Sequence, residues 1–334
     1  MIVRGKIFAV HTATTLSAAM LGMLLSVPTF SHMAPLDLNG PALDEQRTMA
    51  EELALGGPKP INAEDNRLDF DRIKDPLVER VAKASVALFF SSELSRISDG
   101  RLQSKGTRFG ARFLMCKDES FTEQITAAFC SGTLVADDVV LTAAHCVREA
   151  STRPGDPALS DVRFVFGFRA KNYDDPGRSQ FGLEEVYSGV EVIAARRDIS
   201  DRDAEDWATI RLDRPVPATV ANPIMSRRIK VAKGMHVYAV GYPIGLPVKY
   251  AAGAQIRNDD SGASFKADLD TFQGNSGSGV FLSETNELLG ILVRGDPDFY
   301  MDQKARPPCR RTYRCGTVGC TGEVVTRIEK VRMQ

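Results

Sequence analysis

The stretch QGNSGSG at residues 273–279 places Ser276 between Gly274 and Gly277. A serine hydroxyl is a weak nucleophile, so a site that uses it needs a base for its proton and backbone N–H groups for the oxyanion on the substrate. Flanking glycines suit the second need, because a backbone without Cβ atoms can approach a substrate closely. The same pattern is also typical of an ordinary Gly/Ser turn. The choice between these interpretations depends on whether the chain supplies a base.

The chain has four histidines, so the candidates for that base are few. His11 and His32 lie in a segment with the character of an export signal. His236 alternates with apolar residues, as a structural histidine in a half-buried strand does. His145 follows an apolar run that ends in small residues, VVLTAAHC at 139–146. We therefore predict that His145 is the base.

An imidazole base also needs a carboxylate that orients it, and Asp206 is the best candidate. Asp206 begins the apolar segment DWATIRL at residues 206–212, where a carboxylate can be buried behind the imidazole. Asp198, Asp201 and Asp203 precede it in a charged loop, and their setting is typical of surface charges.

Four segments follow one another in the order CSGTLV (130–135), LTAAHC (141–146), DWATIRLDRPV (206–216) and GNSGSG (274–279). Together they resemble the chymotrypsin clan of serine proteases, and the likeness covers roughly residues 64–328. The order histidine, aspartate, serine differs from that of α/β-hydrolases and of subtilisin-type enzymes. The chain looks most similar to bacterial secreted members related to the glutamyl endopeptidases, through DNRLD (65–69), GYPIGLP (241–247) and DTFQGNSGS (270–278).

The resemblance implies a secreted serine endopeptidase that forms an acyl-enzyme on a protein or peptide substrate. It assigns catalysis to His145, Asp206 and Ser276, and the oxyanion hole to the N–H groups of Gly274 and Ser276. No cofactor and no metal are expected. The alternative is a catalytically silent binding protein with a protease fold that acts on a partner.

Two carboxylates bear on the expected specificity. Asp270 matches the acid in the primary pocket of trypsin and Glu323 matches a pocket wall, so both favour Arg or Lys before the scissile bond. The alternative is that Asp270 is a structural part of the motif. Leu292 stands where glutamyl endopeptidases carry a histidine, which argues against glutamate preference. The expected substrate-binding residues are Asp270, Thr271, Val293, Arg294, Gly295 and Glu323.

Asn275 stands where trypsin-like enzymes carry an aspartate that pairs with the new N-terminal ammonium after activation. A neutral amide cannot form that ion pair, so we predict no activation switch of the trypsin type.

Short segments of period two, separated by loops rich in Asp, Gly and Pro, indicate an all-β sandwich or barrel. The resemblance specifies two six-stranded antiparallel β-barrels of the chymotrypsin type, with the active site in the cleft between them. A helix is expected after the Asp75-Pro76 start signal, with Leu77 and Val81 on its buried side. The expected strands are residues 85–90, 107–115, 128–136, 139–142, 162–168, 190–194, 207–212, 237–240, 248–256, 265–269, 279–282, 288–293 and 324–328.

The N-terminus has the pattern of a secretory signal, with Arg4 and Lys6 before an apolar core at 16–27 that is short for a membrane span. We expect a signal peptide at 1–34, a lead-in at 35–74 that is either a propeptide or a surface arm, with a short helix at 42–55, and barrels at 75–216 and 217–334. The protein is therefore expected outside the cell or in the periplasm, with no membrane association after signal removal. A net charge of −1 predicts no nucleic-acid partner, and the oligomeric state is left open.

The chain has six cysteines, an even number that fits an oxidising compartment. The resemblance pairs Cys130 with Cys146. The other four allow three pairings, and disulfides are favoured over zinc because no histidine lies near these cysteines in the sequence. These four are Cys116, Cys309, Cys315 and Cys320.

Overall fold

The computed structural model describes residues 61–62, 65–151, 154–198, 205–225, 229–259, 262–295, 297–315 and 322–332. These residues belong to one compact unit, Leu43–Gln334. The predicted signal peptide and the predicted helix at 42–55 lie outside the described residues. None of the helices in the described ranges has the length and apolar character that crossing a bilayer requires.

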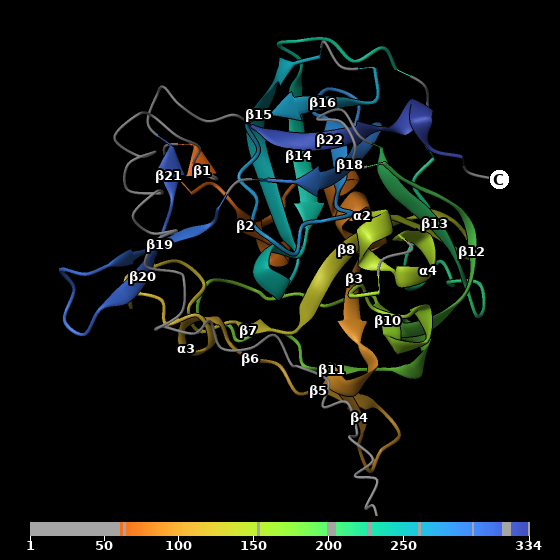
Figure 1. The fold of residues 1–334 in the computed structure, drawn as a ribbon. Helices are drawn as coiled ribbons and strands as arrows, with labels where there is room; N and C mark the ends of the chain where they lie inside the picture. The colour runs from red at the N-terminus through yellow and green to blue at the C-terminus, as the bar shows by residue number, and fades with distance from the viewer. Residues whose placement is uncertain are drawn as a thin grey trace, which may run out of the picture. The chain divides into compact units, whose positions relative to one another are not determined.

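The first half of the described chain forms a closed antiparallel barrel of six strands (Figure 1). Its core is made by apolar side chains that are fully buried, among them Leu88, Val140, Phe164 and Ile210. Around the barrel the strands are β10 (Val162–Val165), β12 (Val186–Arg197), β13 (Asp206–Leu212), β9 (Val139–Thr142), β8 (Ala128–Ala136) and β3 (Ser85–Phe90), which pairs with β10 again.

The second half forms another antiparallel barrel of six strands, closed by the pairing of its strands β14 and β15. The strands are β14 (His236–Gly241), β17 (Gly279–Leu282), β18 (Leu288–Arg294), β22 (Glu323–Arg327), β16 (Ser264–Ala267) and β15 (Lys249–Asn258). The short strand β2 (Leu68–Asp69) pairs with the free edge of β15. The predicted all-β fold of two six-stranded barrels is therefore confirmed.

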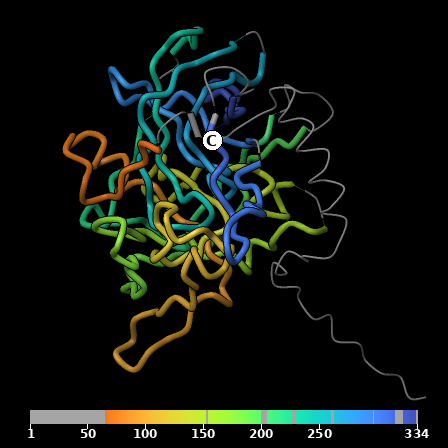
Figure 2. Tube along the Cα trace, turned by 90° about the vertical axis from the view of Figure 1, so that its left-hand side faces the viewer, coloured from red at the N-terminus to blue at the C-terminus, as the bar shows by residue number. Residues whose placement is uncertain are grey.

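Smaller elements lie outside the barrels. A three-stranded sheet contains the hairpin of β4 and β5, which projects from the first barrel in both views (Figures 1 and 2). The smaller strands are β1 (Ile61–Asn62), β4 (Leu94–Arg96), β5 (Leu102–Ser104), β6 (Thr107–Arg108), β7 (Ile125–Thr126), β11 (Gln180–Phe181), β19 (Phe299–Asp302), β20 (Cys309–Thr312) and β21 (Arg314–Cys315). Two four-residue helices, α3 (Phe109–Arg112) and α4 (Arg148–Ser151), complete the set.

Helix α2 (Pro76–Ala84) begins where the sequence predicts, because the Asp75 side chain accepts a hydrogen bond from the Leu77 N–H at 2.8 Å. The prediction that Leu77 is buried is wrong, since that residue is 56% exposed. The buried face starts one position later, at Val78, and continues at Val81 and Ala82, the spacing of one helical face.

The predicted strand at 107–115 is also wrong. Only β6 is extended there, and the chain then turns into α3. Phe109 and Phe113 are four residues apart, and their ring centroids lie 5.6 Å from each other. Their contact follows the helical period, which overrides the alternation that a strand requires.

Two disulfides tie the described chain together. The expected bridge between Cys130 and Cys146 is present, and a second bridge joins Cys116 to Cys309 across 193 residues. The side chain of Cys315 and the whole of Cys320 lie outside the described residues.

Candidate active site

His145 and Asp206 meet because of strand pairing in the first barrel. Strands β9 and β13 are antiparallel with Thr142 opposite Ala208, so the start of β13 lies beside the turn that follows β9. That turn, Ala144–Cys146, carries His145. Oδ2 of Asp206 lies 2.8 Å from Nδ1 of His145, and its Oδ1 accepts the backbone N–H of His145 at 3.1 Å.

This arrangement determines the role of each imidazole nitrogen. A carboxylate can only accept hydrogen bonds, so Nδ1 of His145 carries the hydrogen and Nε2 has the free lone pair. The Asp206 side chain is 8% exposed and that of His145 is 24% exposed. The acid is thus shielded behind a ring that substrate can reach.

The Ser276 loop of the second barrel lies against the same part of the first barrel. The N–H of Ser131, on β8, donates to the carbonyl oxygen of Ser276 at 2.8 Å. Sγ of Cys146, the residue after His145, lies 3.7 Å from that same oxygen. Within the described chain the Ser276 hydroxyl makes no hydrogen bond, which is common for catalytic serines before substrate binds.

Two glycines give the loop its shape. Gly274 and Gly277 have φ values of 92° and 85°, a backbone conformation that residues with a side chain rarely adopt. A Cβ atom on Gly274 would come within 2.8 Å of the carbonyl oxygen of Tyr242. A Cβ atom on Gly277 would overlap the carbonyl oxygen of Ser131. Gly277 is therefore required for the close contact between the two barrels, and Gly274 for the contact of the loop with Tyr242 inside the second barrel.

The loop leaves two N–H groups available. The N–H groups of Asn275, Gly277 and Ser278 donate to backbone carbonyls at 2.7–3.0 Å. Those of Gly274 and Ser276 donate to none of the described residues. Two free donors beside a serine are what an oxyanion on the substrate requires.

Asn275 is buried, and its Oδ1 accepts the hydroxyl hydrogen of Ser278 at 3.0 Å. The amide is therefore satisfied within its own loop. The absence of a trypsin-type activation switch stays a prediction.

A cavity of about 390 Å³ opens beside Ser276. Of the expected substrate-binding residues, Arg294, Gly295 and Glu323 line it. Asp270, Thr271 and Val293 are buried and are not part of the lining. The complete lining is Phe272, Gln273, Ser276, Leu292, Arg294, Gly295, Pro297, Asp298 and Glu323.

Arg67 was not predicted as a site residue, yet it lies directly behind this cavity. Its side chain is 2% exposed, forms a two-point ion pair with Asp65 at 2.8 Å, and has Cζ 4.0 Å from the ring centroid of Phe272. Burial alone would lower the pKa of Arg67, but Asp65 and, more weakly, Asp270 and Asp298 raise it. Asp270 therefore interacts with the positively charged side chain of Arg67. The DNRLD segment was the only local signal for this cluster.

Residues 130–291 match a family model described as a trypsin-like peptidase domain. Over these residues, which are just under half of the chain, the sequence is similar to trypsin-like peptidases. The matched stretch includes His145, Asp206 and Ser276, whereas Arg67, Asp298 and Glu323 lie outside it.

Two solved structures are also similar to this chain. A Glu endopeptidase in complex with MPD is 17% identical, with 71% of this chain and 88% of that chain covered and a TM-score of 0.44. Human heparin binding protein is 13% identical, with 75% and 87% covered and a TM-score of 0.43. A search of curated proteins found no match.

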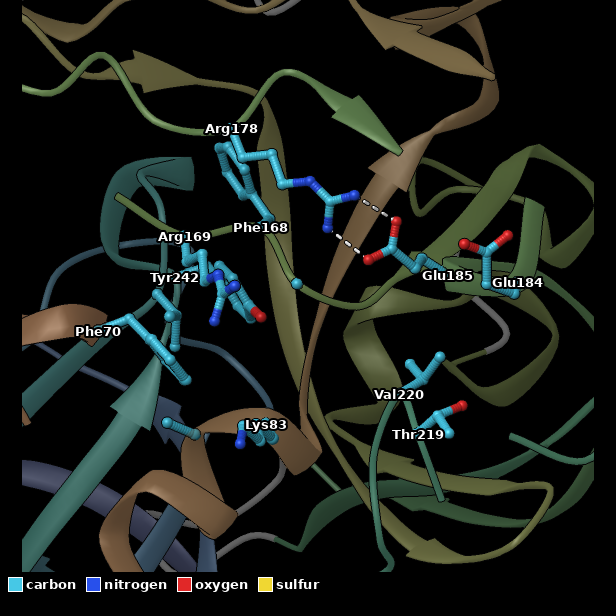
Figure 3. A pocket seen from close by; sticks show the side chains of 13 residues that line it. Phe70, Lys83, Phe168, Arg169, Arg178, Glu184, Glu185, Thr219, Val220 and Tyr242 are labelled. Atoms are coloured by element: carbon cyan, nitrogen blue, oxygen red, sulfur yellow. Dashed lines mark hydrogen bonds and ion pairs between the residues drawn. The ribbon is translucent and has the colours of Figure 1, made fainter. Parts of the chain in front are cut away.

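A second cavity, of about 330 Å³, contains none of the predicted site residues in its lining. Figure 3 shows the guanidinium of Arg178 directed at the carboxylate of Glu185, and the two groups form a two-point ion pair. Arg169 lies over the ring of Phe70 at 4.7 Å. The charged groups here are thus largely engaged with one another or with an aromatic ring.

One cluster among the described residues has the composition of a metal site. Ligand atoms of Cys130, His145 and Cys146 lie within 4.8 Å of one another. The two sulfurs are joined in a disulfide and are not thiolates, so they do not supply metal ligands. His236, the other described histidine, is exposed at the start of β14 and does not line either cavity.

Proposed function

We propose that the protein is a serine endopeptidase in which His145, Asp206 and Ser276 cleave peptide bonds through an acyl-enzyme. The observation that supports this most strongly is the 2.8 Å contact between Asp206 and His145. It lies in the turn against which the Ser276 loop packs.

In this mechanism Nε2 of His145 takes the proton of Ser276 as Oγ bonds to the scissile carbonyl carbon. Asp206 holds the imidazole and stabilises the imidazolium that forms. The negative charge on the carbonyl oxygen is received by the free N–H groups of Gly274 and Ser276. His145 then protonates the leaving amine, and a water molecule repeats the sequence to release the acyl group.

The proposal extends to the organisation of the chain. The N-terminal barrel, within residues 75–216, supplies the base and its carboxylate, and the C-terminal barrel, within 217–334, supplies the nucleophile. Two disulfides are typical of proteins that work outside the cytosol. They support an exported protein whose signal peptide is residues 1–34.

The cavity beside Ser276 supports a preference for Arg or Lys before the scissile bond. Two carboxylates, those of Glu323 and Asp298, belong to its lining. The one cation in the lining is Arg294, and its side chain is exposed. Glu323 is 4% exposed, and a buried negative charge favours a substrate that brings a positive one.

The test is to replace the nucleophile and follow two readouts. We expect wild-type protein to be labelled by a fluorophosphonate and to cleave a peptide library, and Ser276→Ala to lose labelling and about a million-fold in turnover. Ser283→Ala, which changes an exposed serine outside the site, is the matched control and keeps both readouts.

Substantial cleavage by Ser276→Ala would contradict the proposed nucleophile. Folded wild-type protein that neither reacts with the probe nor cleaves peptides would instead support the silent binding protein. Cleavage only after apolar residues would contradict the preference for Arg or Lys while leaving the catalytic assignment intact.

A further inference from the structure

Asp298 is a carboxylate of the cavity that the sequence did not indicate. It lies between β18 and β19, and its Oδ2 accepts the N–H of Gln273 at 2.9 Å. Gln273 immediately precedes Gly274, whose N–H is one of the two free donors. The carboxylate is therefore held by the same loop that positions the reacting groups.

The second oxygen of Asp298 is available for a ligand. Oδ1 accepts no hydrogen bond from the described residues. The side chain is half-buried, and Oδ1 is not one of the buried atoms that lack a partner, so solvent reaches it. A cationic group that enters the cavity can reach this oxygen without breaking an existing hydrogen bond.

The other carboxylates near the cavity are less suited to this role. The carboxylate of Glu323 packs directly against the backbone of Gly295, in the space where a Cβ atom of that residue would lie. Asp270 is 3% exposed, does not line the cavity and interacts with Arg67. Among the described carboxylates near the cavity, Asp298 is thus the one that combines a position on the lining with an accessible oxygen.

The charges around Asp298 come from several elements. Arg67 faces it from the segment before β2, Arg294 from β18 and Glu323 from β22. Asp270 interacts electrostatically with Arg67 and therefore affects Asp298 only indirectly. Burial raises the pKa of Asp298 to about 7, although the Gln273 N–H and the charge of Arg67 lower it. A positively charged side chain bound beside the carboxylate would favour its ionised form.

We propose that Asp298 is a specificity-determining residue, whose carboxylate pairs with the arginine or lysine side chain before the scissile bond. This inference rests on the proposed endopeptidase function. It places recognition on the segment after β18, rather than on Asp270.

The first experiment uses the wild-type protein and two fluorogenic peptides that differ only in Arg or Leu before the scissile bond. A pH effect on the catalytic groups that is common to both peptides cancels in the ratio of their kcat/KM values, so this ratio reports on the pocket. Because kcat/KM reports the free enzyme, we expect the Arg-to-Leu ratio to rise about tenfold from about pH 6 to about pH 8 as Asp298 ionises. A ratio that does not change with pH would overturn the inference.

The second experiment changes the charge alone. Asp298→Asn keeps the size of the side chain and an acceptor for the Gln273 N–H, and we expect it to lower the Arg-to-Leu ratio about tenfold or more and to remove its pH dependence. Asp298→Glu keeps the charge and is expected to keep the preference for Arg. Glu284→Gln, the same loss of charge at an exposed position, leaves the ratio and its pH dependence unchanged.

An unchanged ratio in folded Asp298→Asn would also overturn the inference, and if that variant does not fold, the wild-type pH series still decides. Fluorophosphonate labelling of wild-type Ser276 distinguishes the two proposals. Labelling with a flat ratio refutes only the role of Asp298, whereas the absence of labelling and cleavage refutes the endopeptidase itself.

Discussion

At the scale of single residues, the Asp206 carboxylate illustrates how one side chain fixes another. One oxygen holds the ring of His145 and the other holds its backbone N–H. Rotation of the imidazole would break the first bond, and movement of the turn would break the second. The orientation of the imidazole is therefore set by local hydrogen bonds that exist without substrate, which is the preorganisation that its proposed role as a base requires.

Arg67 provides the clearest residue-scale prediction. It is buried and paired with Asp65, so Arg67→Met leaves Asp65 as an uncompensated buried charge. Because breaking a buried ion pair from one side is costly, we expect a loss of about 3 kcal/mol in the free energy of unfolding, measured by urea denaturation.

The chain offers a matched control for this change. Asp99 and Arg101 repeat the Asp-x-Arg arrangement with a hydrogen-bonded ion pair, but on an exposed hairpin. Arg101→Met should leave the unfolding curve unchanged, because exposed pairs contribute little. Equal effects of the two substitutions would contradict the role given to Arg67.

At the scale of elements, the Gly277 turn joins the serine loop to the first barrel. We expect Gly277→Ala to destabilise the fold by about 2 kcal/mol or more, because the residue has φ near 85° and a Cβ atom would overlap the Ser131 carbonyl. Thermal unfolding measures this, and fluorophosphonate labelling should slow in parallel as the loop moves. Gly262→Ala, at an exposed glycine with open space around it, should change neither value.

The local pattern of apolar and polar residues was sufficient to predict the strands near the motifs. The predicted bounds of β3, β8, β9 and β17 agree with the structure, because each is a run of buried residues between clear turn signals. The local pattern gave a wrong prediction at residues 107–115, where the contact between Phe109 and Phe113 follows the helical period.

The cavity shows why the rest of the site could not be predicted. Arg67 and Asp298 interact electrostatically although they are 298 − 67 = 231 residues apart in the chain. Neither residue stands in a pattern that indicates its partner. Their proximity follows from the pairing of β2 with β15 and from the path of the chain after β18, which are properties of the assembled barrels.

At the scale of the whole molecule, buried hydrogen bonds connect the two barrels. Tyr242 follows β14, the first strand of the second barrel. Its hydroxyl donates a hydrogen bond to the carbonyl oxygen of Ser85 in the first barrel at 3.0 Å. The Ser131 hydroxyl donates to the Gly274 carbonyl at 2.8 Å and accepts the N–H of Tyr242 at 3.0 Å. The barrels are therefore coupled next to the loop that carries Ser276, the proposed nucleophile.

This coupling predicts a dependence of stability on alkaline pH. Burial raises the pKa of Tyr242 above its ordinary value of about 10. Since the folded-state pKa lies above that of the unfolded chain, the stabilisation is complete below about pH 10 and is lost as the pH rises further. Urea unfolding between about pH 9 and pH 11 should therefore show a loss in wild-type protein that is about 1 kcal/mol smaller in Tyr242→Phe. The same loss in both proteins would contradict this, and Tyr300→Phe, at an exposed tyrosine, should behave as wild type.

The central claim is that an imidazole from the first barrel activates a hydroxyl from the second. The most direct measurement is the rate of fluorophosphonate labelling in wild-type protein and in His145→Ala, with the modified residue identified by mass spectrometry. We predict an adduct on Ser276, formed at least about a hundred times more slowly in the variant. An adduct on another residue, or equal rates in the two proteins, would contradict the claim.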